Sequence, residues 1–299
     1  MPPSVQTSGR VATLGPAERL RAIASVEEGR LWTLGLDLLG RQPTPAYPER
    51  PTQLHIVYRD WSHYEKGAVT PLPGGVCSVD DGVLLNCHGG THLDALGHII
   101  VDGTIAGGQP ASTTVGGLAQ ADVAEIARVG IVCRAVVADV ARFAGGEPLD
   151  RDYQITLETL LACLEEEGAS VGRGDMLLIR TGSLLRYQLE GADRFFRGYS
   201  EPGLSHEEAL LAWVDETEIL GIGTDTLANE LPRCPATGEE YPLHRYLLRD
   251  RGLQFHEALW LEELAEDCAA DRRYAGMYCA SPLKLVGCSG SPLNPLFLR

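Results

Sequence analysis

The side chains most able to do chemistry lie between Cys87 and His98. The stretch from His88 onward reads His-Gly-Gly-Thr-His-Leu-Asp-Ala-Leu-Gly-His, which places three of the chain's eight histidines and one aspartate within eleven residues. Imidazole nitrogens and a carboxylate oxygen suit zinc, manganese, iron or cobalt. The composition of this stretch predicts a metal site formed by His88, His92 and Asp94, rather than an ordinary polar turn.

The backbone between the two first histidines must bend for this site to form. On a helix, with about 100° per residue, His88 and His92 would share a face, but Asp94 and His98 would not. On an extended chain His88 and His92 would be about 13 Å apart, too far for two ligands of one ion. Glycine tolerates the backbone angles of a sharp turn, so Gly89 and Gly90 are the expected position of the bend.

Two histidines and one carboxylate fill only part of a coordination shell. The open positions can hold water or a substrate oxygen, as in catalytic sites, whereas structural zinc sites are closed by four protein ligands. His98 is then free to act as a general base or acid, because the pKa of histidine lies near neutrality. These residues alone do not choose a hydrolase over a non-haem iron oxygenase, but their composition favours a catalytic site over a non-catalytic metal-binding protein.

The same stretch resembles the His-x-Gly-Thr-His-x-Asp-x-x-x-His signature of the cyclase family of metal-dependent hydrolases, which includes bacterial kynurenine formamidases and isatin hydrolases. The resemblance covers roughly residues 30 to 297. Its further motifs lie at 35–39, 130–142, 174–182, 223–226, 242–244, 281–283 and 290–295. The resemblance implies a swivelling β/β/α fold, with a β-barrel-like core and flanking helices, assembled as a homodimer or homotetramer.

The resemblance also implies roles for single residues. His88, His92 and Asp94 match the first metal ligands, and His98 matches the proton-transfer histidine. His244 and Glu257 stand where members with two ions place a later histidine and glutamate, so one or two Mn²⁺ or Zn²⁺ ions are expected.

The activity that the resemblance implies is the opening of an amide, cyclic amide or formamide C–N bond by a metal-activated water. A lactone hydrolase and a polyketide-type cyclase or dehydratase are the alternatives within the family. Trp61, His63 and Tyr64 form a polar and aromatic patch ahead of the signature. This patch is a candidate lining of the substrate pocket.

The surrounding pattern predicts a mixed α/β fold. Strands are expected at 53–58, 82–87, 130–140, 175–180 and 218–225, and helices at 17–29, 156–168, 205–213, 244–252 and 260–271. Strands and helices interleave through the second half of the chain. We expect a loose arm and a helix over residues 1–29 and one hydrolase domain over residues 30–299.

The formal net charge of −16 disfavours binding to nucleic acid or to an anionic membrane. From the polar first fifteen residues we expect no secretory signal, and no apolar run of the sequence is long enough to span a membrane. Eight cysteines without a Cys-x-x-Cys pair indicate reduced thiols. The expected protein is cytoplasmic and acts on a small molecule.

Overall fold

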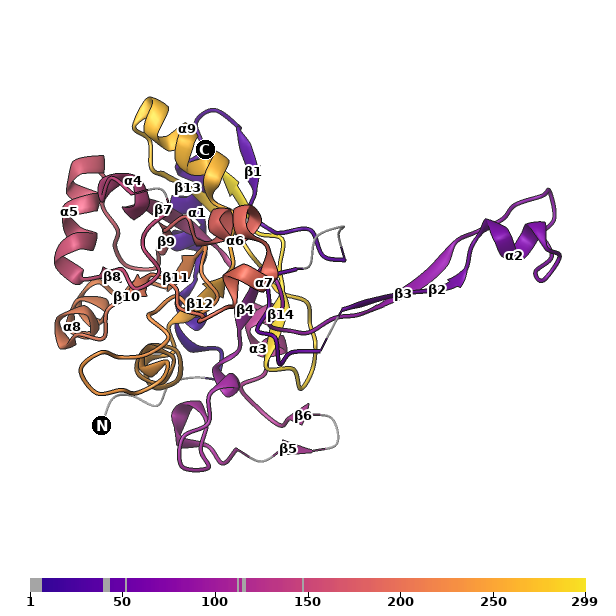
Figure 1. Ribbon diagram of the computed structural model, residues 1–299, viewed down its shortest axis with the longest axis horizontal. Helices are drawn as coiled ribbons and strands as arrows, with labels where there is room; N and C mark the ends of the chain where they lie inside the picture. The colour runs from indigo at the N-terminus through magenta and orange to yellow at the C-terminus, as the bar shows by residue number, and fades with distance from the viewer. Residues whose placement is uncertain (1–6, 40–43, 52, 112, 115–116, 147) are drawn as a thin grey trace.

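The computed structural model describes residues 7–39, 44–51, 53–111, 113–114, 117–146 and 148–299. It consists of a body with a curled sheet, and a long arm that projects from it (Figure 1). The body is a mixed α/β structure, which confirms the fold class predicted from the sequence. All eight cysteines are free thiols.

Nine strands form the central sheet, in the order β1-β15-β13-β7-β9-β11-β12-β4-β14. The middle strands β7, β9, β11 and β12 run parallel, and the strands at both sides of them are antiparallel. In the order of the sheet their bounds are Leu31–Thr33, Leu296–Leu298, Ala275–Cys279, Val132–Asp139, Met176–Arg180, Gly221–Thr224, Gln254–Glu257, His92–Asp94 and Gly290–Pro292.

Helices cover both faces of this sheet, and one further helix, Trp61–Glu65, lies at the far end of the arm (Figure 1). The helices are α1 (Pro16–Ala24), α2 (Trp61–Glu65), α3 (Val123–Val129), α4 (Val140–Phe143), α5 (Leu157–Glu167), α6 (Ser183–Glu190), α7 (Ala192–Phe195), α8 (Glu208–Thr217) and α9 (Glu262–Asp271). Short 3-10 turns are η1 (Gly9–Thr13), η2 (Leu96–His98) and η3 (Ala106–Gly108), and η4 (His244–Arg249) is a π-helix. Small strand pairs are β2 (Leu54–Arg59) with β3 (Asp80–Leu84), β5 (Thr113–Thr114) with β6 (Gly117–Leu118), and β8 (Gln154–Ile155) with β10 (Gly203–Leu204).

Alternating side chains of the middle strands build two separate cores. Val136 and Ala138 of β7 pack on one side, with α5, α8 and η4, whereas Ala135 and Val137 pack on the other side, with α3 and α9. Successive side chains of a strand point to opposite faces, so a strand that is buried on both faces reads as a continuous apolar run. This explains why the strand over 130–140 was predictable.

Helix α5 shows how local signals set the boundaries of an element. The Thr156 side chain accepts a hydrogen bond from the backbone N–H of Thr159 at the start, and Gly168 ends the helix in a left-handed conformation. Both are common helix-terminating features, and they confirm the predicted helix over 156–168.

The arm is a two-stranded ribbon of β2 and β3 that carries α2 at its far end (Figure 1). The strand expected over 82–87 therefore differs from the structure. Strand β3 ends at Leu84 and pairs only with β2, and the chain then returns to the body before His88.

The sequence predicted a loose segment at the N-terminus, but the described N-terminal residues pack against the body. Val11 and Leu14 are buried in the core, and the Arg10 N–H donates to the carbonyl of Gly252. Residues 1–6 lie outside the described residues. The division of the chain at residue 30 stays a prediction.

Candidate metal centre

A sharp turn before β4 brings His88 back over the strand that carries His92 and Asp94. Gly90 has a φ of 68°, a left-handed conformation that favours glycine, and a Cβ there would lie 2.5 Å from Thr44 Cγ2. The turn confirms the bend predicted at Gly89 and Gly90. His92 and Asp94 then point to one face of β4, as alternate residues of a strand do.

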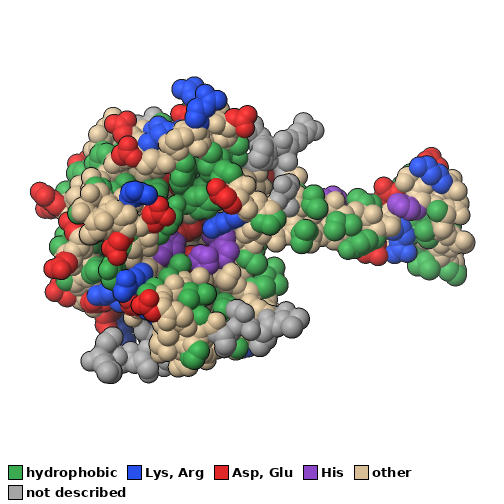
Figure 2. Space-filling model, turned by 60° about the horizontal axis from the view of Figure 1, so that its bottom comes forward, with side chains coloured by type: hydrophobic (Ala, Val, Ile, Leu, Met, Phe, Trp, Pro, Cys, Tyr) green, Lys and Arg blue, Asp and Glu red, His purple; other side chains and the backbone are tan. Residues whose placement is uncertain are grey.

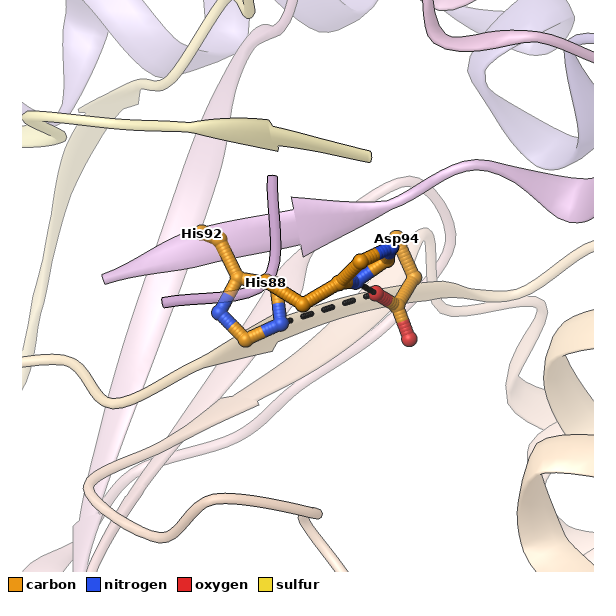
Figure 3. Close-up of side chains that lie close together, drawn as sticks. All are labelled: His88, His92 and Asp94. Atoms are coloured by element: carbon orange, nitrogen blue, oxygen red, sulfur yellow. Dashed lines mark hydrogen bonds and ion pairs between the residues drawn. The ribbon is translucent and has the colours of Figure 1, made fainter. Parts of the chain in front are cut away.

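The first three predicted ligands meet in the structure. His88 Nδ1 lies 2.7 Å and His92 Nε2 lies 3.6 Å from Asp94 Oδ1 (Figure 3). One ligand atom from each of these buried residues lies within 4.8 Å of the other two, which is close enough for a shared metal ion.

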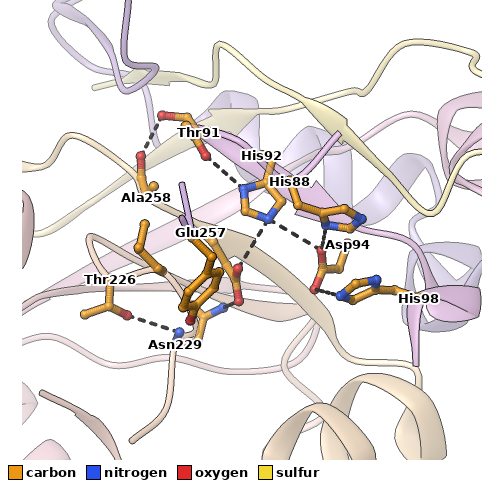
Figure 4. Close-up of polar contacts among 12 residues, drawn as sticks. His88, Thr91, His92, Asp94, His98, Thr226, Asn229, Glu257 and Ala258 are labelled. Atoms are coloured by element: carbon orange, nitrogen blue, oxygen red, sulfur yellow. Dashed lines mark hydrogen bonds and ion pairs between the residues drawn. The ribbon is translucent and has the colours of Figure 1, made fainter. Parts of the chain in front are cut away.

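Asp94 also belongs to a second group of possible ligands. Its Oδ2 lies 3.6 Å from Nε2 of His244, and that nitrogen lies 3.3 Å from Oε1 of Glu257. Glu257 is the last residue of β12 and is the direct partner of His92 in the antiparallel pairing of β12 with β4. Its Oε2 lies 3.3 Å from His92 Nε2, so the two groups form one continuous centre (Figure 4).

The ligand atoms of this centre are buried and in part without hydrogen-bond partners. His92 and Asp94 are each 1% exposed, and His92 Nε2 and Asp94 Oδ2 make no hydrogen bond within the described part of the chain. His92 Nδ1 donates to the carbonyl of Gly90, so its Nε2 carries the lone pair that faces the centre. Buried polar atoms are rarely left unsatisfied. A divalent cation fits this set of donors and would satisfy them.

The electrostatics keep the two carboxylates charged. Burial raises the pKa of Asp94, but the neighbouring His98 and His88 outweigh it and hold this pKa well below its usual value. Burial and the charge of Asp94 both raise the pKa of Glu257, but the imidazoles of His244 and His92, each 3.3 Å from its carboxylate, outweigh them and leave this pKa lowered. Two carboxylates are therefore available as anionic ligands.

His98 lies beside the centre at the end of η2. Its ring stacks on His88, with 4.1 Å between ring centroids, and its Nε2 is 4.0 Å from Asp94 Oδ2. The side chain is 26% exposed. Burial lowers its pKa to about 4, so the imidazole is neutral at physiological pH and can accept a proton.

The centre lies in a hollow of the body. Figure 2 shows histidine side chains inside this hollow, close to the root of the arm. On one side Tyr241 stacks edge-on against His244, with 5.8 Å between centroids, and Tyr47 stacks on Tyr241. Tyr241 also lines a neighbouring pocket of about 510 Å³ whose lining includes none of the candidate ligands.

Comparison with known proteins places this centre in a family. Residues 36–230 match the family model named Cyclase, which is well over half of the chain. The chain belongs to the cyclase family. No curated protein matches it.

Solved structures with the same fold include a cyclase and two isatin hydrolases. One described as a novel cyclase is 27% identical, with a TM-score of 0.87, and the match covers 98% of this chain and 96% of that one. Isatin hydrolase A from Labrenzia aggregata is 26% identical, with a TM-score of 0.65 and coverage of 92% and 94%. Isatin hydrolase A from Ralstonia solanacearum is 24% identical, with a TM-score of 0.64 and coverage of 90% and 92%.

The cyclase-family chain does not bring Trp61, His63 and Tyr64 to its own centre. All three lie on α2 at the far end of the arm (Figure 1). Trp61 is 64% exposed, His63 pairs with Asp60, and the Tyr64 hydroxyl contacts Ser78. Their role in substrate binding stays a prediction.

Sequence reasoning missed four residues that support the candidate ligands. The Ser289 hydroxyl lies 2.8 Å from His88 Nε2, and the Thr91 hydroxyl donates to the carbonyl of Ala258 beside Glu257. Asn229 and Glu230 contact Glu257 and His244. Two signals were available in the sequence: Thr91 belongs to the His-x-Gly-Thr-His signature, and Asn229 and Glu230 are an amide and an acid inside the apolar stretch Leu-Ala-Asn-Glu-Leu.

Proposed function

We propose that this cyclase-family protein is a metal-dependent hydrolase that opens an amide or cyclic amide C–N bond. The observation that carries the proposal is the convergence of two triads on Asp94: His88, His92 and Asp94, and Asp94, His244 and Glu257. Both contain buried imidazole and carboxylate groups, and two of the ligand atoms have no hydrogen-bond partner among the residues that the structure describes.

The candidate ligands would hold one or two Mn²⁺ or Zn²⁺ ions. Such an ion, when bound, polarises a carbonyl oxygen and makes a water far more acidic. His98 is not needed as a ligand, and its neutral imidazole faces the centre. It accepts the proton of the attacking water at Nε2 and returns it to the leaving nitrogen.

The choice of a C–N bond is supported by the similarity to isatin hydrolases, because isatin is a cyclic amide. Lactones are the next class of substrate, since a lactone carbonyl needs the same polarisation and the same proton transfer. A purely structural metal site is disfavoured because His98 adds an accessible proton acceptor that the ligand set does not use.

The test uses protein stripped of metal by a chelator and reloaded with Mn²⁺ or Zn²⁺. Hydrolysis is followed for an N-formyl aromatic amine, isatin, a γ-lactam and an unsaturated lactone, with the wild type beside His98→Ala. We expect metal-dependent cleavage of at least one amide, a kcat reduced by about 100- to 10,000-fold in the variant, and unchanged metal content.

The alternative results separate the parts of the proposal. Cleavage of the lactone alone would mean that the substrate contains an ester-type bond and not an amide C–N bond. Tight metal binding without any hydrolysis would contradict the proposed reaction. Failure to bind either metal would contradict the metal centre itself.

We also propose that the protein is a homo-oligomer in which the arm docks on a second copy. Leu54, Ile56, Tyr58 and Leu84 form an apolar face of the ribbon, and each is at least 40% exposed. An isolated two-stranded hairpin is at best marginally stable in water. The arm over 54–84 has about 30 residues, the number that one partner contributes to a standard interface.

A further inference from the structure

The loop after β11 places two consecutive polar residues against the two later ligands of the centre. The Asn229 side-chain amide donates to Glu257 Oε1 over 3.1 Å. Glu230 Oε1 accepts a hydrogen bond of 2.7 Å from His244 Nδ1. Asn229 has a φ of 57°, a left-handed conformation in which Asn is tolerated better than most residues.

Glu230 is saturated with donors on the side away from the centre. The backbone N–H groups of Leu243 and His244 each donate to it over 2.8 Å, at the start of η4. His206 Nε2 lies 2.8 Å from Oε2 of Glu230, the oxygen that also accepts from Leu243. Glu230 is completely buried, so these contacts leave it little freedom to move.

These contacts determine which atoms of the ligands face Asp94. Because Nδ1 of His244 is bound to Glu230, its Nε2 is the nitrogen that points to Asp94 and Glu257. A carboxylate that accepts from the outer nitrogen of a ligand histidine fixes its orientation and tautomer. Asn229 acts in the same way on Glu257, whose Oε2 remains directed to His92.

The loop itself is held by close packing. The Leu204 N–H donates to the carbonyl of Asn229, and the Leu231 N–H donates to the carbonyl of Leu204. A Cβ added to Gly203 would clash with the backbone of Glu230. Because this backbone is packed against β10, the side chains of Asn229 and Glu230 are held in place, and so are the ligands that they contact.

We propose that Asn229 and Glu230 are positioning residues that hold Glu257 and His244 in the orientation in which, together with Asp94, they would bind a second divalent cation. The proposal rests on the proposed metal centre and extends it to residues outside the ligand set. His88 and His92 make no hydrogen bond to Asn229 or Glu230 that would tie the first triad to this loop.

The test counts and titrates the ions rather than measuring turnover. Metal-free wild type, Glu230→Gln and Asn229→Ala are titrated with Mn²⁺ by calorimetry, and bound Mn²⁺ is followed by electron paramagnetic resonance. The glutamine keeps the volume of Glu230 but turns an amide NH₂ toward N–H donors. Glu240→Gln is the matched control, because Glu240 is an exposed acid with a side chain that is 64% accessible.

We expect two ions per chain in the wild type and in the control, with the spin coupling of neighbouring Mn²⁺ ions. In Glu230→Gln the second ion should bind 10- to 100-fold more weakly, the coupling should vanish, and the first ion should bind as before. Asn229→Ala should show the same selective loss, and Gly203→Ala should reproduce it without changing either positioning side chain.

Three outcomes would overturn the inference. Two ions bound with wild-type affinity in Glu230→Gln would show that the residue positions nothing. Equal weakening of both ions would indicate a general structural role. A wild type that binds one ion would remove the second site and leave the proposed hydrolase intact, whereas a wild type that binds none would contradict the proposed function itself.

Discussion

At the scale of single residues, Asp94 links the two halves of the candidate centre. Its Oδ1 faces His88 and its Oδ2 faces His244, and no other residue of the chain belongs to both groups of possible ligands in the part that the structure describes. It lies on β4 with Leu93 fixed in the core behind it. The residue is therefore the one on which metal binding depends most.

Glu201 is a second buried acid, outside the centre, and it predicts a pH dependence of stability. It is completely buried and accepts hydrogen bonds from Tyr199 and from the Leu227 N–H, and burial raises its pKa from 4.5 to about 7. The folded protein thus holds this proton more tightly than the unfolded chain. The free energy of unfolding should fall as the pH rises from 4.5 to about 7, by on the order of 1 to 3 kcal/mol.

Urea unfolding of wild type and Glu201→Gln over this pH range measures the effect. The variant has no ionisable group at this position, so its free energy of unfolding should decline less steeply than that of the wild type. Parallel curves for the two proteins would show that Glu201 does not titrate in this way.

At the scale of elements, the turn before β4 decides whether His88 reaches Asp94. We expect Gly90→Ala to lower the free energy of unfolding by more than the roughly 1 to 2 kcal/mol that a left-handed backbone costs, because its Cβ would also meet Thr44. Metal affinity should fall as well, since the turn positions His88. Chemical unfolding and metal titration measure the two effects.

Gly103→Ala is the matched control for this turn. Gly103 has a φ of 70°, close to that of Gly90, but a Cβ there would meet nothing within 4 Å. It should show the backbone cost alone and keep full metal affinity. Equal losses in the two variants would mean that the contact with Thr44 does not matter.

The proposed homo-oligomer depends on the arm formed by β2 and β3. Replacing Ile56 or Tyr58 by aspartate puts a charge on the apolar face of the ribbon and should dissociate the oligomer to a species of 32.3 kDa. Light scattering after size-exclusion chromatography measures the mass. His55→Ala alters the opposite face, where His55 pairs with Asp81, and should leave the mass unchanged. A monomeric wild type would contradict the proposed docking.

At the scale of the whole molecule, the ligands connect distant parts of the chain. They come from the turn before β4, from β4 itself, and from β12 and η4, which lie far from it in sequence; β4 and β12 are adjacent strands of the central sheet. An ion that binds only the folded state stabilises the whole body. Among the described residues, no helix has the length and apolar character needed to cross a membrane.

Metal removal should therefore lower the unfolding temperature of the protein. At an ion concentration 100-fold above Kd, binding adds about 2.7 kcal/mol to the free energy of unfolding. Differential scanning calorimetry with and without a chelator measures the shift. Asp94→Asn should show almost no response to the chelator, and an equal response in both proteins would place the stabilising ion elsewhere.

The sequence by itself determined the features that depend on neighbouring residues. The donors from His88 to His98, the glycine turn between them and the ends of α5 at Thr156 and Gly168 all follow from local chemistry. A strand buried on both faces, such as β7, is also visible as a continuous apolar run. In each case the side chains that set the structure lie within a few residues of one another.

The resemblance to a family named His244 and Glu257 as later ligands, but only the tertiary structure decided how these distant residues reach the centre. Glu257 reaches His92 because β12 pairs with β4 in one register, and Glu230 reaches His244 because packing against Gly203 holds its loop. The direction of the arm, and with it the position of Trp61, was likewise undetermined. Strand order, register and the direction of a hairpin arise from long-range contacts, and spacing along the chain carries no information about them.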